Sequence, residues 1–351
     1  MSKLLENLSS GKPILINPKV AEAYARKISG ISPSSFNPDF LTAMFGKKPV
    51  FEKFPPYAFI PVKGVIGKGL TPLESMCDSC DLDDVYDMLC DCEYDDDIET
   101  VIMVYDTPGG GCVGVEEIAR KIKNFKKETI SFTAKDCCSA GYWMASQAKK
   151  FYATPSSTVG SIGCYIAYVD SAKAWDMEGF KMEVIKSGLF KGTGINGTSL
   201  DSNQRKMLQD EVNEIHMNFK ADVKSVRTMV DDSCMEGQTF SGKKAAEMYM
   251  VTGLVDCLYD LLYDLDENLA KQYKADEEND ERHDLAGKAK AKAKAKIKST
   301  AKKDDDEDEE DEEEDEEDMK KKGEDDPSKR TPEDEDEDGE DAVDTDKDYK
   351  K

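Results

Sequence analysis

Histidine is almost absent from this chain: only His216 and His283 occur among 351 residues. His283 falls in a charged tail, and His216 falls well inside a predicted helix. A catalytic base has to reach its nucleophile, and such bases usually lie at strand ends or in loops. The sequence therefore disfavours a Ser-His-Asp triad.

Long apolar runs are also missing. The opening stretch MSKLLENLSSGKP is too polar for a signal peptide, and no segment reaches transmembrane length. Ten cysteines without an export signal indicate a reducing compartment, so we expect a cytoplasmic protein without membrane contact. The pattern G-x-x-x-x-G-K-[ST] is absent as well, which disfavours a phosphate-binding loop.

Negative charge is concentrated at the C-terminus. Of the net charge of −26, residues 275–351 contribute −18, from 35 acidic and 17 basic side chains. Residues 304–318 are all acidic, and a basic repeat, KAKAKAKAKIK, spans residues 288–298. Such blocks cannot bury a core and repel themselves, so 275–351 is expected to be a disordered tail. Nucleic-acid binding is disfavoured because the acidic residues outnumber the basic repeat.

Four cysteines cluster at Cys77, Cys80, Cys90 and Cys92, a set that raises the possibility of a zinc site. The alternative is a helix over residues 82–92 with apolar residues facing the core. Cys90 and Cys92 would then point about 200° apart on that helix, which is poor geometry for one ion. We therefore predict no metal, and no cofactor.

Strands and helices alternate from residue 57 onward, which predicts an α/β domain with a mainly parallel sheet and flanking helices over residues 56–274. Residues 1–55 form an N-terminal arm with one helix, residues 17–29, capped by Asn17. The expected strands are 57–66, 100–106, 129–135, 150–154 and 161–170, and residues 175–188 supply a helix and a strand. The expected helices are 82–92, 113–125, one opened by Ser139, 202–229, one within 237–256, and one at 259–273.

The first candidate site feature is the glycine turn YDTPGGG, which follows the buried strand 100–106. The backbone N–H groups of Gly109 and Gly110 carry no shielding side chains and are expected at a helix start. Such groups stabilise a developing oxyanion. An ordinary glycine turn between strand and helix is the alternative.

The second feature is Ser139 in CCSAGYWMAS, between a predicted strand and a predicted helix. A serine there is commonly an N-cap. Two neighbouring helix starts, one lined with glycine and one carrying a hydroxyl, together suit attack on a carbonyl carbon. A lysine can serve as base if burial lowers its pKa, and VIKSGLFKGTG offers Lys186 and Lys191. The residues alone do not separate the two.

These motifs resemble the signal-peptide-peptidase-A-like serine peptidases, which use a Ser-Lys dyad on a crotonase/Clp-type fold. Five motifs occur in the family's order over about residues 57–260. They are DTPGG, SAGYW, VGSIG, IKSGLFK and FSGKKAAEMYMVTGLVD.

The resemblance implies a role for each matching residue. Ser139 is the implied nucleophile, Lys191 the general base, and Ser161 a serine that holds the lysine by a hydrogen bond. The implied oxyanion donors are the N–H groups of Gly109, Gly110 and Ala140. This chain has DTPGG where the family more often has DSPGG. The change from serine to threonine is harmless if only the backbone of this motif takes part in the chemistry.

The stretch GKPILINPKVAEAYARKI is similar to the opening of the bacteriophage branch, the prohead proteases. That branch implies a homo-oligomer inside the assembling capsid, acting on scaffold, portal or capsid proteins. We further predict that the tail is cut away during assembly, which intact-mass analysis of mature particles tests.

Three alternatives stay open at this point. One is a cytoplasmic signal-peptide-peptidase-like enzyme, and a second is an acyl-CoA-processing crotonase, which has no use for the serine or the lysine. The third is an inactive capsid or scaffold component. Covalent labelling by a serine-directed probe separates a peptidase from the last two.

Overall fold

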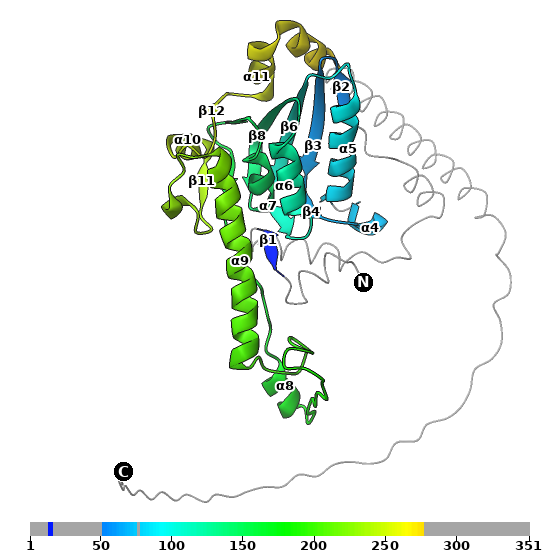
Figure 1. Cartoon of the computed structure of the whole chain (residues 1–351), viewed down its shortest axis with the longest axis vertical. Coiled ribbons are helices and arrows are strands. Elements are labelled where there is room, and N and C mark those ends of the chain that lie inside the picture. The colour runs from blue at the N-terminus through cyan, green and yellow to red at the C-terminus, as the bar shows by residue number, and fades with distance from the viewer. Residues whose placement is uncertain (1–12, 17–50, 76–77, 277–351) are drawn as a thin grey trace, which may run out of the picture. The chain divides into compact units, whose positions relative to one another are not determined.

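The computed structural model describes residues 13–16, 51–75 and 78–276 (Figure 1). The chain divides into two units, residues 1–281 and 282–351, and every described residue belongs to the first. The predicted helix 17–29 and nearly all of the predicted tail lie outside the described residues. No helix among the described residues combines the length and the apolar character needed to span a bilayer.

The main sheet has parallel strands at its centre and antiparallel strands at both edges. Its order is β11-β10-β8-β6-β3-β2, and β9 pairs parallel with β8 and with β12. The predicted α/β class with a mainly parallel sheet is confirmed. The strands are β2 Glu52–Phe54, β3 Tyr57–Lys63, β6 Thr100–Thr107, β8 Glu128–Cys138, β9 Lys150–Ala153, β10 Thr158–Gly160, β11 Thr239–Ser241 and β12 Gly253–Leu254.

A smaller sheet continues from the carboxyl ends of these strands, in the order β1-β7-β4-β5. The predicted strand 57–66 breaks at Gly64, whose φ of 85° turns the chain out of β3 and into this second sheet. The strands are β1 Ile14–Ile16, β4 Val65–Gly67, β5 Ser79–Asp81 and β7 Gly109–Gly111.

Helices pack on both faces of the main sheet (Figure 1). On one face α5, α6 and α7 enclose the larger core, and on the other α11 packs against Phe59, Ile102 and Ile130. The remaining helices lie in the connections. The bounds are α4 Pro72–Ser75, α5 Leu82–Tyr94, α6 Val115–Lys123, α7 Ala140–Ala145, α8 Ala172–Met177, α9 Ser202–Val226, η2 Asp232–Cys234, α10 Gly242–Glu247 and α11 Leu258–Leu265.

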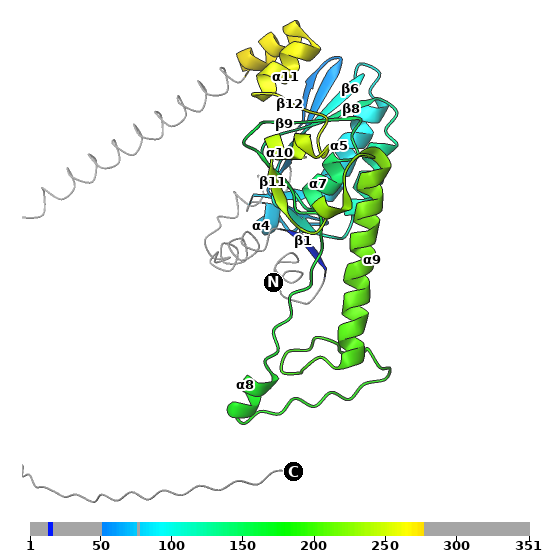
Figure 2. The same cartoon turned by 90° about the vertical axis from the view of Figure 1, so that its left-hand side faces the viewer.

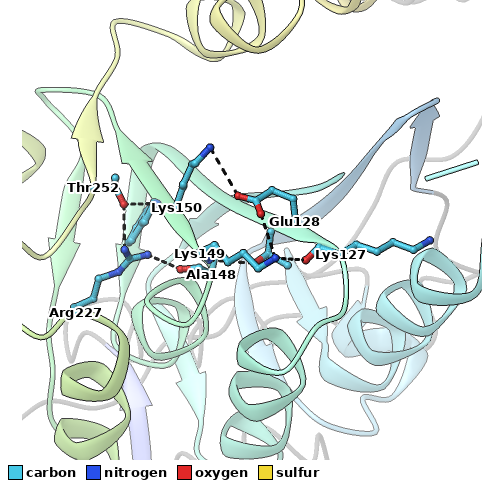
Figure 3. A network of polar contacts seen from close by, with 9 residues as sticks. Lys127, Glu128, Ala148, Lys149, Lys150, Arg227 and Thr252 are labelled. Atoms are coloured by element: carbon cyan, nitrogen blue, oxygen red, sulfur yellow. Dashed lines mark hydrogen bonds and ion pairs between the residues drawn. The ribbon is translucent and has the colours of Figure 1, made fainter. Parts of the chain in front are cut away.

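The long helix α9 is fixed at its C-terminal end by a buried arginine (Figure 3). Arg227 donates from Nη2 to the Ala148 carbonyl at 2.7 Å and from Nη1 to Thr252 Oγ1 at 3.1 Å. At the other end the helix begins with a capping box between Asp201 and Gln204. The C-terminal half of α9 is therefore held against α7, while its N-terminal half runs away from the sheet (Figure 2).

Two predicted strands are wrong. Residues 161–170 run as extended chain with a single β-bridge, Ile14 to Tyr165, and the strand expected within 175–188 does not form. Both stretches have strand-like side chains, but β structure also requires a neighbouring strand with free hydrogen-bonding groups. The described part of the chain supplies no such neighbour along most of these residues.

Two of the four clustered cysteines belong to the core, and Cys90 is only partly buried. Cys80 in β5 and Cys92 in α5 are both buried among apolar side chains. Burial raises the pKa of each thiol to about 12, so both stay protonated. Cys77 lies outside the described residues.

Candidate active site

Ser139 lies at the junction of the central strand β8 and helix α7, as predicted, but it does not act as a helix cap. Its φ of 53° and ψ of −118° are unusual for a residue with a side chain, and its hydroxyl makes no capping bond. The backbone is held there by two bonds, from Ser139 N–H to the Gly160 carbonyl at 2.7 Å and from Trp143 N–H to the Ser139 carbonyl at 2.9 Å. Such strain is typical of residues positioned for chemistry.

The surroundings of Ser139 are apolar. The preceding thiols, Cys137 and Cys138, are buried, and burial raises the pKa of both, that of Cys138 to about 12. Ser139 itself is 1% exposed. An amine that entered such a site would lose solvation, and its charged form would be disfavoured.

The glycine turn lies beside Ser139, but its local structure differs from the prediction. Gly109 and Gly110 belong to strand β7, and helix α6 begins only at Val115. A Cβ built on Gly109 would lie 2.9 Å from Ser139 Cβ, so only glycine allows this approach. The backbone of the turn therefore lies next to the Ser139 side chain, on a strand instead of a helix terminus.

The threonine of DTPGG contributes its side chain, which the sequence prediction missed. Thr107 Oγ1 accepts a hydrogen bond from Gly109 N–H at 3.1 Å and donates to the Gly64 carbonyl at 2.6 Å. Serine has the same hydroxyl, so the frequent DSPGG form preserves both bonds. In this state Gly109 N–H points to Thr107, while Ala140, the first residue of α7, has no intrahelical acceptor for its N–H.

Ser161 lies in the loop that passes the nucleophile. Ser139 bonds to both ends of this loop, through its N–H to Gly160 and through its hydroxyl to the Gly163 carbonyl at 3.5 Å. Ser161 has a φ of 55° and lines a cavity of about 360 Å³ together with His216. His216 Nε2 lies 2.7 Å from the Met235 carbonyl, a contact that fits its predicted structural role.

Lys191 does not meet Ser139 within one chain. It is exposed, and its backbone N–H bonds to Gly188 in the segment between α8 and α9. That segment lies at the N-terminal end of α9 (Figures 1 and 2), whereas Trp143 of α7 stacks on Phe219 near the other end, with ring centroids 4.5 Å apart. From Ser202 to Phe219 the helix rises by about 25 Å. Ser139, Ser161 and the glycines come together, and Lys191 stays apart.

The segment that carries Lys191, residues 165–201, leaves apolar side chains in solvent. Among residues 165–201 only Gly197 is buried. Ile185 is 99% exposed and Phe180 62%. Apolar side chains gathered on an exposed segment are typical of a surface that binds another protein.

Comparison with known proteins finds relatives whose names describe proteases. A protein of Methanocaldococcus jannaschii whose name describes it as a protease is 28% identical over 174 residues, 48% of this chain and 55% of that protein. Capsid assembly protease C of Escherichia phage lambda is 25% identical over 208 residues, 57% of this chain and 46% of that protein. A ClpP1 variant of Listeria monocytogenes covers 57% of this chain and 92% of its own, at 11% identity and a TM-score of 0.37.

A family model also matches part of the chain. Residues 121–271 match the model of peptidase family S49, which confirms the predicted resemblance. The chain spans about half the length of the curated relatives that it matches.

Proposed function

We propose that the chain is a serine endopeptidase in which Ser139 is the nucleophile and Lys191 the general base. The observation that carries the proposal is the backbone of Ser139, held at positive φ beside Gly109 without a capping role. Ser161 would orient the lysine amine. The N–H groups of Gly110 and Ala140, with that of Gly109 once it turns from Thr107, would hold the oxyanion.

The chemistry follows from these positions. A neutral Lys191 amine takes the Ser139 proton as Oγ attacks the scissile carbonyl, and the backbone donors stabilise the negative oxygen. The protonated amine then donates its proton to the leaving amine, which leaves an acyl-enzyme. Water attacks the ester with the amine again acting as base, and Ser139 is restored.

We propose further that a second copy of the chain supplies Lys191. The exposed apolar segment 165–201 and the distance along α9 support this arrangement, because apolar side chains of the segment such as Ile185 and Phe180 lie in solvent. In a neighbouring copy, the extended residues 161–170 or a similar strand edge can supply backbone groups with which this segment pairs. The predicted homo-oligomer would then be a condition for activity.

The nucleophile is tested by a fluorophosphonate probe and by hydrolysis of a denatured protein. Ser139→Ala is expected to abolish both labelling and hydrolysis. Ser225→Ala, a matched change of an exposed serine that bonds to the Asp222 carbonyl, is expected to leave both intact. Full activity of Ser139→Ala would exclude this role.

The base is tested by comparing the two lysines of one motif. Lys191→Ala is expected to abolish hydrolysis, while Lys186→Ala, which loses only a bond to the Leu189 carbonyl, is expected to retain it. Chains carrying Ser139→Ala and chains carrying Lys191→Ala are then mixed and reassembled. A lysine supplied between copies restores activity at about a quarter of the interfaces, and a mixture that stays inactive argues against it.

The proposed setting is a phage prohead, with scaffold, portal or capsid proteins as substrates and the prohead interior as the location. Similarity to the lambda capsid assembly protease supports this role. Coexpression with phage scaffold, portal and capsid proteins is expected to give discrete fragments that disappear in Ser139→Ala. Cleavage of exported precursors instead would favour the signal-peptide-peptidase-like role.

A further inference from the structure

Strand β1 lies between two backbone segments, β7 on one side and residues 163–165 on the other. We call the space between these two segments the groove, and the segments its walls. On one side β1 pairs antiparallel with β7, with Ile14 opposite Gly111 and Ile16 opposite Gly109. On the other side Ile14 N–H donates to the Tyr165 carbonyl at 2.9 Å, and Tyr165 N–H donates to the Ile14 carbonyl at 3.2 Å. The three-residue strand is thus paired with β7 along one edge and bonded at Ile14 on the other.

This groove passes directly over the candidate nucleophile. A Cβ built on Gly109 would lie 2.1 Å from the Leu15 carbonyl oxygen and 2.9 Å from Ser139 Cβ, so a β1 carbonyl and the serine crowd the same point. The second wall carries Gly163, whose carbonyl faces the Ser139 hydroxyl. An extended peptide in this position therefore lies between the candidate oxyanion donors and the loop of Ser161.

The side chains of β1 indicate what the groove accepts. Ile14, Leu15 and Ile16 are exposed by only 2%, 0% and 2%, and Leu15 packs into the larger core. Ile16 also lines the cavity of about 360 Å³ that Ser161 and His216 line. An extended aliphatic strand suits the walls, because main-chain bonds give affinity and alternate side chains give selectivity.

We infer that Ile14–Ile16 occupies the place of the substrate strand at the Ser139 site and must leave before a protein substrate binds. The inference rests on the proposed function and names both the substrate class, extended aliphatic peptides, and the internal segment that excludes them. Release is feasible because the strand has three residues, and Pro13, which lacks an N–H, cannot donate to extend the ladder.

The first experiment weakens β1 in the full chain and measures the rate of fluorophosphonate labelling and of hydrolysis of an aliphatic peptide. Ile14→Pro removes the N–H that bonds to Tyr165, and Leu15→Asp places a charge in the core. We expect both rates to rise about tenfold, as for a binding-competent state that is populated at roughly one tenth. Tyr94→Asp, at a side chain 76% exposed on α5, is the control and should change neither rate.

The second experiment needs no substitution. A synthetic peptide of residues 12–18 is added to the full chain, and hydrogen exchange at the Leu15 and Ile16 amides is followed. Displacement of β1 by the peptide is expected to speed exchange at both amides. A peptide with Asp in place of Leu15 should have no effect.

The outcomes separate the two claims. Folded β1 variants with unchanged or slower rates, or amides that exchange equally with and without peptide, overturn the inference. Failure of the probe to label Ser139 in every chain overturns the proposed function. In that case hydrogen exchange still decides whether β1 is displaced by a peptide.

Discussion

At Ser139 and Gly109 two residues approach more closely than two ordinary side chains could. Ser139 has a positive φ and lies with its Cβ close to the glycine strand, and the missing Cβ of Gly109 leaves room for it. Neither feature stabilises the fold by itself. Their combination supports a chemical role, because strained backbone persists only where the surrounding structure imposes it.

The first prediction concerns Gly109→Ala. The new methyl group would collide with the Leu15 carbonyl and with Ser139, and φ at this position is 100°. We expect loss of probe labelling and a decrease of more than about 1 kcal/mol in the free energy of unfolding. Gly179→Ala is the control, since Gly179 also has a positive φ but nothing lies within 4 Å of its added Cβ. If both variants lost labelling and stability equally, the effect of Gly109→Ala would come from backbone strain alone and not from its contact with Ser139.

At the scale of elements, the packing of α7 on α9 sets the direction in which α9 leaves the sheet. Trp143 of α7 stacks on Phe219 at an interplanar angle of 7°, and its indole N–H donates to Asp222 at 2.8 Å. The same helix start positions Ser139. The site and the segment carrying Lys191 are therefore connected through one helix contact.

The second prediction is that Trp143→Ala lowers the free energy of unfolding by about 3–5 kcal/mol, the usual cost of removing a buried aromatic side chain. Urea unfolding measures it. Trp175→Ala removes the other tryptophan, which is only half-buried within residues 165–201, and should cost clearly less. A similar loss for both variants would contradict the proposed importance of the α7–α9 contact.

The third prediction concerns pH and the contact between α5 and α6. Lys121 hydrogen-bonds to Glu93, whose side chain is 9% exposed, and this bond lowers the pKa of the Glu93 carboxyl. The folded-state pKa is thus below the unfolded one. The stabilisation is complete above the unfolded pKa, near 4.3, and is lost as the pH falls through the folded value.

Glu93→Gln is therefore expected to cost about 1 kcal/mol near neutral pH and progressively less below pH 4.3. Urea unfolding at a series of pH values gives the difference from the parent chain. Glu247→Gln breaks the exposed pair with Lys244 and should change little at any pH. A difference that is constant with pH would exclude this ion pair as its source.

For the whole molecule, the segment 165–201 is the feature whose apolar side chains are most exposed among the residues named here. Ile185 and Phe180 project into solvent from residues that the sequence predicts to be strand and helix. A neighbouring copy would bury them and bring Lys191 to a serine site. Assembly and catalysis would then depend on the same contacts.

The fourth prediction is that Ile185→Asp combined with Phe180→Asp lowers both the assembly mass, measured by light scattering, and the rate of hydrolysis. Charges at the centre of an apolar interface oppose association because they lose hydration on burial. Tyr94→Asp again serves as control. An unchanged mass would place the interface elsewhere.

The elements that depend on interactions between residues close in the sequence were predicted, and those that depend on distant residues were not. Helices α5 and α9 were predicted well because their periodicity and caps are local, and β6 because its apolar run is contiguous. The sequence analysis missed strand β1, because Pro13–Ile16 has too few residues to show a strand-like alternation of side chains. It also missed the placement of Gly109 in a strand. Both depend on partners that are distant in the sequence.

The sequence by itself determined the α/β class, the serine at the strand-to-helix junction and the glycine-lined neighbour, because each is written in short, contiguous patterns. Only the tertiary structure decided which backbone faces Ser139 and how far Lys191 lies from it. Those relations depend on strand pairing between remote segments, such as Ile14 with Gly111 and with Tyr165, and on the direction in which a helix leaves its core. No local pattern encodes either of them.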